Sequence, residues 1–194
     1  MKGGFFPLIS RMKYVNRWSL MRNTQEENLM EHSFETAAIA QALAIIGKKV
    51  YNKSVSAERI ASAALYHDCS EIITGDMPTP IKYGNQALRE AYKEVELSAK
   101  ERLCSLVPDI FREEYEELLC FEEKYPEEYK YIKAADKISA YLKCIAEEQG
   151  GNCDFVSAKN QLKQSIADMQ MEEADYFMEN FLHLYGKTLD ELTV

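Results

Sequence analysis

The chain has 194 residues, of which 46% are hydrophobic and 28% are charged, and its formal net charge is −9 at pH 7. This length and composition predict a single globular domain over residues 1–194 and exclude a disordered or low-complexity chain. The negative charge argues against binding of nucleic acid polymers through phosphate neutralisation, and no apolar run approaches the ~20 residues that a membrane span requires.

The first 25 residues differ in charge from the rest of the chain. They contain five basic residues and no acidic one, whereas residues 113–128 contain eight glutamates. The apolar run before Arg11 is too short for a secretory signal, so we expect a cytoplasmic protein. A small anionic ligand could bind where this basic segment meets a cleft.

The first two predicted helices carry histidines on their apolar faces. In the helix predicted over residues 30–46, one stripe is formed by His32, Thr36, Ile39, Leu43 and Ile46. A second helix is predicted from an N-cap at Ser56 to about residue 72. On this helix Ile60, Ala64, His67 and Glu71 are predicted to share one face. A stiff loop is predicted from Gly75, Pro78 and Pro80.

Helical periodicity continues to the end of the chain, and no segment alternates convincingly as a strand would. Pro126 stands at the expected first position of a helix. Further helices are predicted at residues 86–106, 110–122, 127–148, 154–168 and 171–184. The predicted fold class is therefore all-α, a single-domain helical bundle.

The five cysteines are widely spaced, and no pair has the Cys-x2-4-Cys spacing of a structural zinc site. A disulfide scaffold is not expected in a chain of this length. We expect free thiols that mostly pack as small hydrophobic side chains.

Three polar side chains lie on stripes that should face the core, namely His32, His67 and Asp136. Each histidine, taken alone, could be a core residue hydrogen-bonded to a backbone carbonyl. A buried aspartate needs a cation, several donors or a metal, because burial otherwise favours its protonated form. A salt bridge from Asp136 to Lys133 or Lys137 is the alternative, although these lysines point to other sides of the helix.

A metal site explains the same residues together. Two imidazoles and two carboxylates suit a first-row divalent ion better than calcium or a thiolate-bound zinc. Four such ligands leave positions for water and substrate. Glu71, which taken alone could be a surface glutamate or could support a ligand, lies one turn beyond His67 and Asp68 and could orient or deprotonate an attacking water. The candidate ligands are His32, His67, Asp68 and Asp136.

Four motifs in this order resemble the HD-domain phosphohydrolases, and most closely the bacterial 5′-deoxynucleotidases. They are EHS at 31–33, HDCSE at 67–71, TGDMPTP at 74–80 and KAADKISAYLKC at 133–144. The similarity extends over nearly the whole chain and includes RMKYVNRWSLMRN at 11–23 and EADYFMENF at 173–181.

The resemblance implies an all-α HD fold with one divalent transition-metal ion, such as Co²⁺ or Mn²⁺. It implies an enzyme that removes phosphate from deoxyribonucleoside 5′-monophosphates with little regard for the base. Members of this family are cytoplasmic homodimers. The metal ligands that it implies are His32, His67, Asp68 and Asp136.

The resemblance also implies roles for residues outside the metal set. Glu71 corresponds to the residue that helps the attacking water, and Arg17 to the residue that orients the phosphate. Trp18 is expected against the sugar, and Asp76 is expected to accept a hydrogen bond from the 3′-hydroxyl. Further substrate contacts are expected from His32, Asp68, Met77, Pro78 and Thr79.

The chemistry of Arg17 and Trp18 is consistent with these roles. The Arg17 guanidinium is a forked donor that matches phosphate and stays charged, although the residue could also be an exposed helix-surface arginine. Trp18 could be a packing anchor, or its bulk could occupy the space that a 2′-hydroxyl requires. An apolar pocket alone rejects an added hydroxyl by only about a hundredfold, so strong selectivity needs a steric block.

Two other functions use the same motif. One is an HD phosphodiesterase or pyrophosphohydrolase that acts on a signalling nucleotide, and the other is a non-catalytic nucleotide-sensing domain. Two-metal phosphodiesterases need more histidines than the three in this chain, and His183 lies far along it, in a stripe that predicts a structural role. The sensing domain is disfavoured because no predicted ligand or base is missing.

Overall fold

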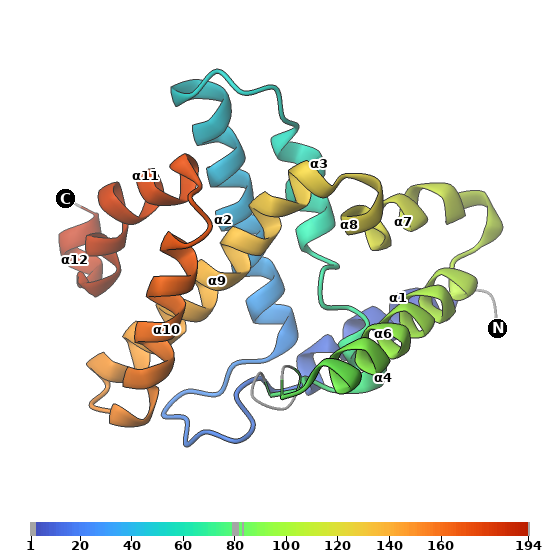
Figure 1. Ribbon diagram of the computed structural model, residues 1–194, viewed down its shortest axis with the longest axis horizontal. Coiled ribbons are helices and arrows are strands. Elements are labelled where there is room, and N and C mark those ends of the chain that lie inside the picture. Colours follow the sequence, from blue (N-terminus) through green and yellow to red (C-terminus); the bar gives the residue numbers. More distant parts are fainter. Residues whose placement is uncertain (1–2, 79–81, 83, 194) are drawn as a thin grey trace.

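The computed structural model describes residues 3–78, 82 and 84–193, and most of these residues lie in α-helices (Figure 1). The helices are α1 (Phe5–Ile9), α2 (Leu29–Val50), α3 (Ala57–Ala64), α4 (Glu71–Thr74), α6 (Gln86–Leu106), α7 (Arg112–Leu119), α8 (Phe121–Lys124), α9 (Pro126–Gln149), α10 (Val156–Ala167), α11 (Glu172–Asn180) and α12 (Leu189–Leu192). In these residues the extended pairing is confined to one isolated bridge, Asn16–Asn28. The all-α prediction is confirmed.

Helices α2 and α9 cross at the centre of the molecule (Figure 1). Helix α2 packs against α3, α9 and α11, and α9 packs in addition against α10. The larger hydrophobic cluster lies between these helices and includes Leu43, Ile60 and Ile138, all fully buried. The stripe predicted on the first helix faces this cluster, which explains why His32 is buried with it.

A smaller hydrophobic cluster joins α1, α6 and α7 to the segment between α3 and α4. Its buried members include Phe5, Cys69 and Leu103. Ala64, at the end of α3, belongs to the larger cluster, and Cys69 belongs to the smaller one. The connection that carries His67 and Asp68 therefore runs from one hydrophobic cluster to the other.

Side-chain caps mark where helices α2 and α3 begin. The Asn28 side chain accepts hydrogen bonds from the backbone N–H groups of Met30 and Glu31. The Glu31 carboxylate in turn accepts from the backbone N–H of Asn28. This capping box starts α2 and places His32 in its first turn. The predicted N-cap at Ser56 and the predicted opening of α9 at Pro126 are both confirmed.

The prediction of one helix from Ser56 to about residue 72 is wrong. Helix α3 ends at Ala64, and residues 65–70 form successive turns before α4 begins at Glu71. The His67 ring donates from Nδ1 to the Ala64 carbonyl at 2.7 Å, and that carbonyl would otherwise accept the next helical N–H bond. The Ala64 carbonyl also accepts the His67 backbone N–H at 3.4 Å, and the Tyr66 N–H already bonds to Ala63, so the chain turns more tightly from Tyr66 onward and the ring helps to satisfy the end of α3.

Three other predictions need correction. The helix predicted at 110–122 is divided at Cys120 into α7 and α8, and the terminal helices α1 and α12 were not predicted. His183 is exposed in the 3₁₀ helix Leu182–Gly186, so it is not part of a buried helical stripe.

The predicted free thiols are confirmed, with Cys153 exposed and the other four at least partly buried. No helix among the described residues has the length and hydropathy to span a bilayer.

Candidate functional site

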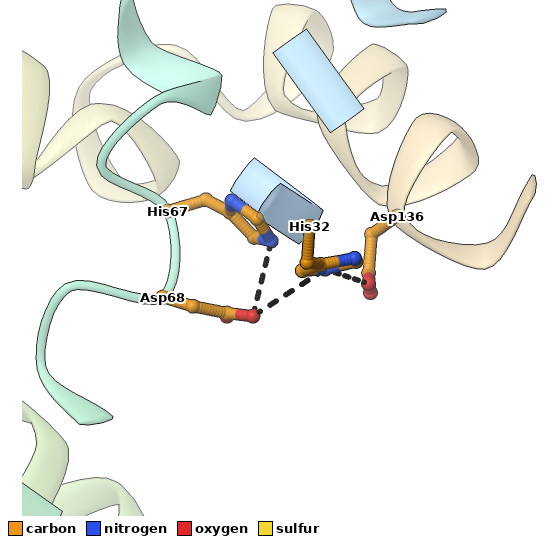
Figure 2. A group of neighbouring side chains, drawn as sticks. All are labelled: His32, His67, Asp68 and Asp136. Atoms are coloured by element: carbon orange, nitrogen blue, oxygen red, sulfur yellow. Dashed lines mark ion pairs between the residues drawn. The ribbon is translucent and has the colours of Figure 1, made fainter. Parts of the chain in front are cut away.

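Two histidines and two aspartates from three segments of the chain meet at one point (Figure 2). His32 comes from α2, His67 and Asp68 from the turns after α3, and Asp136 from α9. One potential ligand atom from each residue lies within 4.8 Å of those of the other three. Nε2 of His32 is 3.1 Å from Oδ1 of Asp136, and Nε2 of His67 is 3.1 Å from Oδ2 of Asp68.

Both imidazoles are oriented by bonds at Nδ1, which leaves Nε2 directed at the cluster. His67 Nδ1 contacts the Ala64 carbonyl, which can only accept, so this nitrogen carries the proton. His32 Nδ1 lies 3.1 Å from Oγ of Ser139, and Ser139 donates its own proton to Glu35 at 2.6 Å. The Ser139 oxygen therefore accepts from His32, and the Nε2 lone pair of each histidine is available to a ligand.

This donor set fits a divalent metal ion. The Nε2 atom of His67 is buried and makes no hydrogen bond, although Oδ2 of Asp68 lies 3.1 Å away, and such an atom is costly unless something else binds it. Imidazole nitrogens combined with carboxylate oxygens are typical of first-row divalent ions. Burial alone would raise the pKa of Asp68, but His67, His32 and Arg17 outweigh it and hold that pKa well below its ordinary value. Asp68 is therefore ionised, as a metal ligand must be.

The alternative explanation for Asp136 is not supported. Lys133 forms an ion pair with Glu122 at 3.1 Å, and Lys137 donates to Ser165. The close neighbour of Asp136 is instead His32: burial would raise the Asp136 pKa, but the His32 contact outweighs it and lowers that pKa.

Arg17 and Trp18 lie in a loop beside the cluster, not on a helix surface. The Arg17 side chain is only 12% exposed, and its Nη1 is 3.4 Å from Oδ2 of Asp68. Trp18 packs against Phe155, with the ring centroids 5.3 Å apart. One oxygen of Glu27 accepts from both residues, at 3.1 Å from Arg17 Nε and 3.0 Å from Trp18 Nε1.

Glu71 and Asp76 are close enough to Arg17 and Asp68 to interact with both electrostatically. Glu71 is 6% exposed, and its Oε2 atom is buried without a hydrogen-bond partner. Burial, reinforced by Asp68 and Asp76, raises the pKa of Glu71 to about 10. Gly75 ends α4 at φ +75°, a conformation that glycine adopts readily, and the chain then reaches Asp76. Burial also raises the pKa of Asp76, although Arg17 and the Trp18 backbone act against it.

The structure thus gathers most of the residues predicted for the site. Met77 and Pro78 follow Asp76 and are partly buried, whereas Thr79 and Pro80 lie outside the described residues. Glu27 and the Ser139–Glu35 pair were not assigned roles from the sequence. A buried hydroxyl at Ser139, on the stripe that carries Asp136, was the available signal for that pair. Nothing in the sequence pattern placed Glu27 opposite Arg17, because their pairing depends on how the loop closes.

Comparisons with known proteins agree over nearly the full length of the chain. A family model described as 5′-deoxynucleotidase YfbR-like matches residues 4–185. A 5′-deoxynucleotidase from Klebsiella pneumoniae is 43% identical over 97% of this chain and 95% of its own length. One from Photobacterium profundum is 42% identical over 99% of both chains.

Solved structures share the fold. An HD-domain phosphohydrolase from Listeria innocua superposes with a TM-score of 0.81 at 28% identity, covering 94% of this chain and 88% of the other. The cyanophage S-2L HD phosphohydrolase DatZ, bound to dA and one catalytic Zn²⁺ ion, has a TM-score of 0.66 at 21% identity, covering 94% and 96%. At that identity, the second likeness concerns the fold alone. The chain belongs to the 5′-deoxynucleotidase YfbR-like family of HD-domain phosphohydrolases.

Proposed function

We propose that this protein is a metal-dependent 5′-deoxynucleotidase, which hydrolyses deoxyribonucleoside 5′-monophosphates to deoxyribonucleosides and phosphate. One observation carries the proposal, namely two histidine nitrogens and two carboxylates within 4.8 Å of one another, with a buried arginine beside them. The relatives named 5′-deoxynucleotidase support the choice of substrate. A phosphate monoester brings two negative charges, and this arrangement can receive them.

The proposed ligands of one divalent ion are His32, His67, Asp68 and Asp136. When bound, Mn²⁺ or Co²⁺ supplies charge for the phosphoryl oxygens and favours ionisation of water near neutral pH. The buried Arg17 adds a permanent positive charge and a forked donor for the phosphate. The contact between Arg17 and Asp68 places this donor directly beside the ligand set.

Glu71 is the proposed base that positions the attacking water. Its carboxyl group is buried next to the cluster and has an unpartnered oxygen. A pKa near 10 means that the group holds a proton in the metal-free protein at neutral pH. Positive charge at the adjacent cluster favours the ionised form, which can accept a proton from water.

The proposed sugar contacts come from Trp18 and from the loop that follows α4. The Trp18 indole is held beside Arg17, so its bulk lies close to the position proposed for the phosphate. Asp76 is proposed to accept from the 3′-hydroxyl, and further contacts are proposed for Met77, Pro78 and Thr79. The proposal includes a single domain over residues 1–194 that acts as a cytoplasmic homodimer, and sedimentation velocity tests the assembly state.

Phosphate release from dAMP, AMP and 3′-dAMP tests the activity, with EDTA in one series and with Mn²⁺ or Co²⁺ in another. Metal-dependent release from dAMP alone is expected. Equal release from dAMP and AMP would remove the selectivity for deoxyribose but keep the metal chemistry. Absence of release from all three, with metal bound, would overturn the proposal.

Glu71→Gln is the variant that tests the proposed base. Its amide has the shape of the carboxyl group but cannot take a proton, so kcat for dAMP should fall about 10²- to 10⁴-fold. Metal affinity, measured by calorimetry, should stay close to that of the unmodified protein because Glu71 is not a proposed ligand. Unchanged kcat would exclude Glu71 as the base.

The alternative functions are less well supported. Among the described residues, one cluster of histidines and acidic residues has metal-ligating geometry. His183, the third histidine of the chain, is exposed far along the sequence from it, so a second metal has no histidine to use. Products that retain more than one phosphate group would nevertheless identify a signalling phosphodiesterase or pyrophosphohydrolase.

A further inference from the structure

The loop that carries Arg17 and Trp18 is closed at its base by backbone pairing. Asn16 and Asn28 form an antiparallel bridge, and the Arg17 N–H donates to the Glu27 carbonyl at 2.9 Å. We call residues 16–28 the N-terminal loop. Its closure places Glu27 directly opposite Arg17, although ten positions separate them in sequence.

The Glu27 side chain then contacts both residues that the proposed function uses to read the substrate. Its Oε2 atom accepts from Nε of Arg17 and from Nε1 of Trp18. The Arg17 contact uses Nε and leaves Nη1 on the side of Asp68. One carboxylate oxygen therefore sets the direction of the guanidinium and of the indole together.

The backbone of Trp18 shows why such a contact is needed. Trp18 has φ +57°, a left-handed conformation that is rare and unfavourable for a large side chain. Such a conformation persists only where its surroundings hold it. The Trp18 carbonyl accepts from the Met21 N–H and from the Asn23 side chain, which holds the backbone. The indole itself is contacted by the Glu27 carboxylate at its nitrogen and by the Phe155 ring, which is tilted against it.

We propose that Glu27 is a positioning residue that couples phosphate orientation at Arg17 to sugar discrimination at Trp18. The inference rests on the proposed function, because it assumes that these two residues contact the phosphate and the sugar. In the proposed site, Glu27 itself contacts neither the phosphate nor the sugar. Its effect passes through the two side chains to which it is bonded.

Loss of the Glu27 charge and loss of its hydrogen bonds are expected to change KM for dAMP in opposite directions. A carboxylate near an anionic phosphate weakens binding, so loss of its charge alone would lower KM for dAMP. Loss of the bonds that orient Arg17 and Trp18 would raise KM and admit the ribonucleotide. The Glu27 side chain is 13% exposed and is paired with Arg17, so its charge is largely offset and the positional effect should dominate.

The test compares Glu27→Ala and Glu27→Gln with Glu26→Ala, a matched change at an exposed neighbour. Trp18 is the only tryptophan, so the emission maximum and acrylamide quenching report directly on its surroundings. Kinetics with dAMP and AMP give KM, kcat and the selectivity ratio, and calorimetry gives the affinity for Mn²⁺ and for dAMP. Circular dichroism confirms that each variant keeps its helical content.

For Glu27→Ala we expect red-shifted emission, a KM for dAMP raised about 10- to 100-fold and a lower ratio of dAMP to AMP hydrolysis. Mn²⁺ affinity should not change. Glu27→Gln keeps an acceptor oxygen and should recover the Trp18 emission and part of the selectivity. Glu26→Ala should match the unmodified protein in every readout.

A changed emission with unchanged KM and unchanged selectivity would overturn the inference, because Glu27 would then be only structural. A lower KM would show that charge dominates and would also overturn it. Failure of the unmodified protein to hydrolyse dAMP would contradict the proposed function instead. In that case, emission and calorimetric dAMP binding still decide whether Glu27 positions these side chains.

Discussion

His32 illustrates how one residue in the site depends on a neighbour that does not touch the substrate. Its Nδ1 proton is accepted by Ser139, whose own proton is donated to Glu35. This chain fixes the tautomer and the ring plane of His32, so that Nε2 meets Asp136. Both His32 and Ser139 are completely buried, and water cannot replace the bond.

Ser139→Ala should therefore weaken metal binding without disturbing the fold. Loss of a hydrogen-bond partner of a metal-ligating histidine typically costs about 10- to 100-fold in metal affinity. Calorimetric titration with Mn²⁺ measures the affinity, and the visible absorption spectrum of the Co²⁺ form reports on ligand geometry.

Ser33→Ala is the matched control for this prediction. Ser33 is also a buried serine, it follows His32 in α2, and its hydroxyl has no hydrogen-bond partner. Its removal should leave Mn²⁺ affinity and the Co²⁺ spectrum unchanged. Equal effects of the two substitutions would show that Ser139 acts through general packing and not through His32.

At the scale of elements, a buried carboxylate at the end of α9 is central to the contacts that hold the N-terminal loop. Glu147 accepts from the backbone N–H groups of Thr24 and Gln25 and from the side chains of Lys143 and Asn152. Burial would raise the pKa of Glu147, but these bonds outweigh it and hold the pKa well below its ordinary value. The loop that presents Arg17 is thus tied to the helix that presents Asp136.

Glu147→Ala should lower the free energy of unfolding by about 3–5 kcal/mol at pH 7, since Lys143 would stay buried without its partner. A lowered pKa means that Glu147 stabilises the fold fully above its ordinary pKa and progressively less as the pH falls below it. The difference between variant and unmodified protein should shrink as the pH is lowered from 5 to 3. Urea unfolding at each pH measures it.

Glu148→Ala is the control for Glu147→Ala. Glu148 is the next residue of α9, and it pairs with Lys159 near the surface. Partly exposed ion pairs of this kind contribute less than about 1 kcal/mol, so the variant should unfold almost like the unmodified protein. A similar loss in both variants would mean that Glu147 has no special role in anchoring the loop.

At the scale of the whole molecule, the metal-ligating cluster joins segments that are far apart in the chain. It links α2, the turns after α3, and α9, and those turns run between the two hydrophobic clusters. Metal binding at this cluster should stabilise the whole folded domain, because the ligand residues come together only when these segments pack.

Addition of Mn²⁺ at about 100 times its dissociation constant should stabilise the protein by about 2.7 kcal/mol. For a chain of this size, the melting temperature should rise by about 5–10 °C, in one cooperative transition. Differential scanning calorimetry with EDTA and with Mn²⁺ measures both the shift and the cooperativity. Two separate transitions would contradict the proposed single domain.

Two histidine variants test where the Mn²⁺ that raises the melting temperature binds. His67→Ala removes a proposed ligand and should abolish the Mn²⁺-dependent shift. His183→Ala removes an exposed histidine outside the cluster and should keep the shift in full. A shift that depended on His183 would place the metal elsewhere.

Much of the fold could be read from periodic patterns and end signals, because these act over one helical turn. The apolar stripe predicts α2, the N-cap Ser56 predicts the start of α3, and Pro126 marks the start of α9. The helix through residue 72 could not be read correctly, because the pattern that favours a helix continues past Ala64. The turns after Ala64 place the His67 ring so that it donates to the Ala64 carbonyl, and the direction in which His67 must point depends on the other segments of the site.

The sequence by itself determined the chemical kinds of group at the site. Two imidazoles and two carboxylates at positions predicted to face the core point together to a metal, because burial of unpaired polar groups is costly. Only the tertiary structure decided that Glu27 lies against Arg17 and Trp18. The same holds for the hydrogen bonds that connect His32 through Ser139 to Glu35, and for the burial of Glu71. These facts depend on contacts between segments distant in the chain, and no local periodicity encodes such contacts.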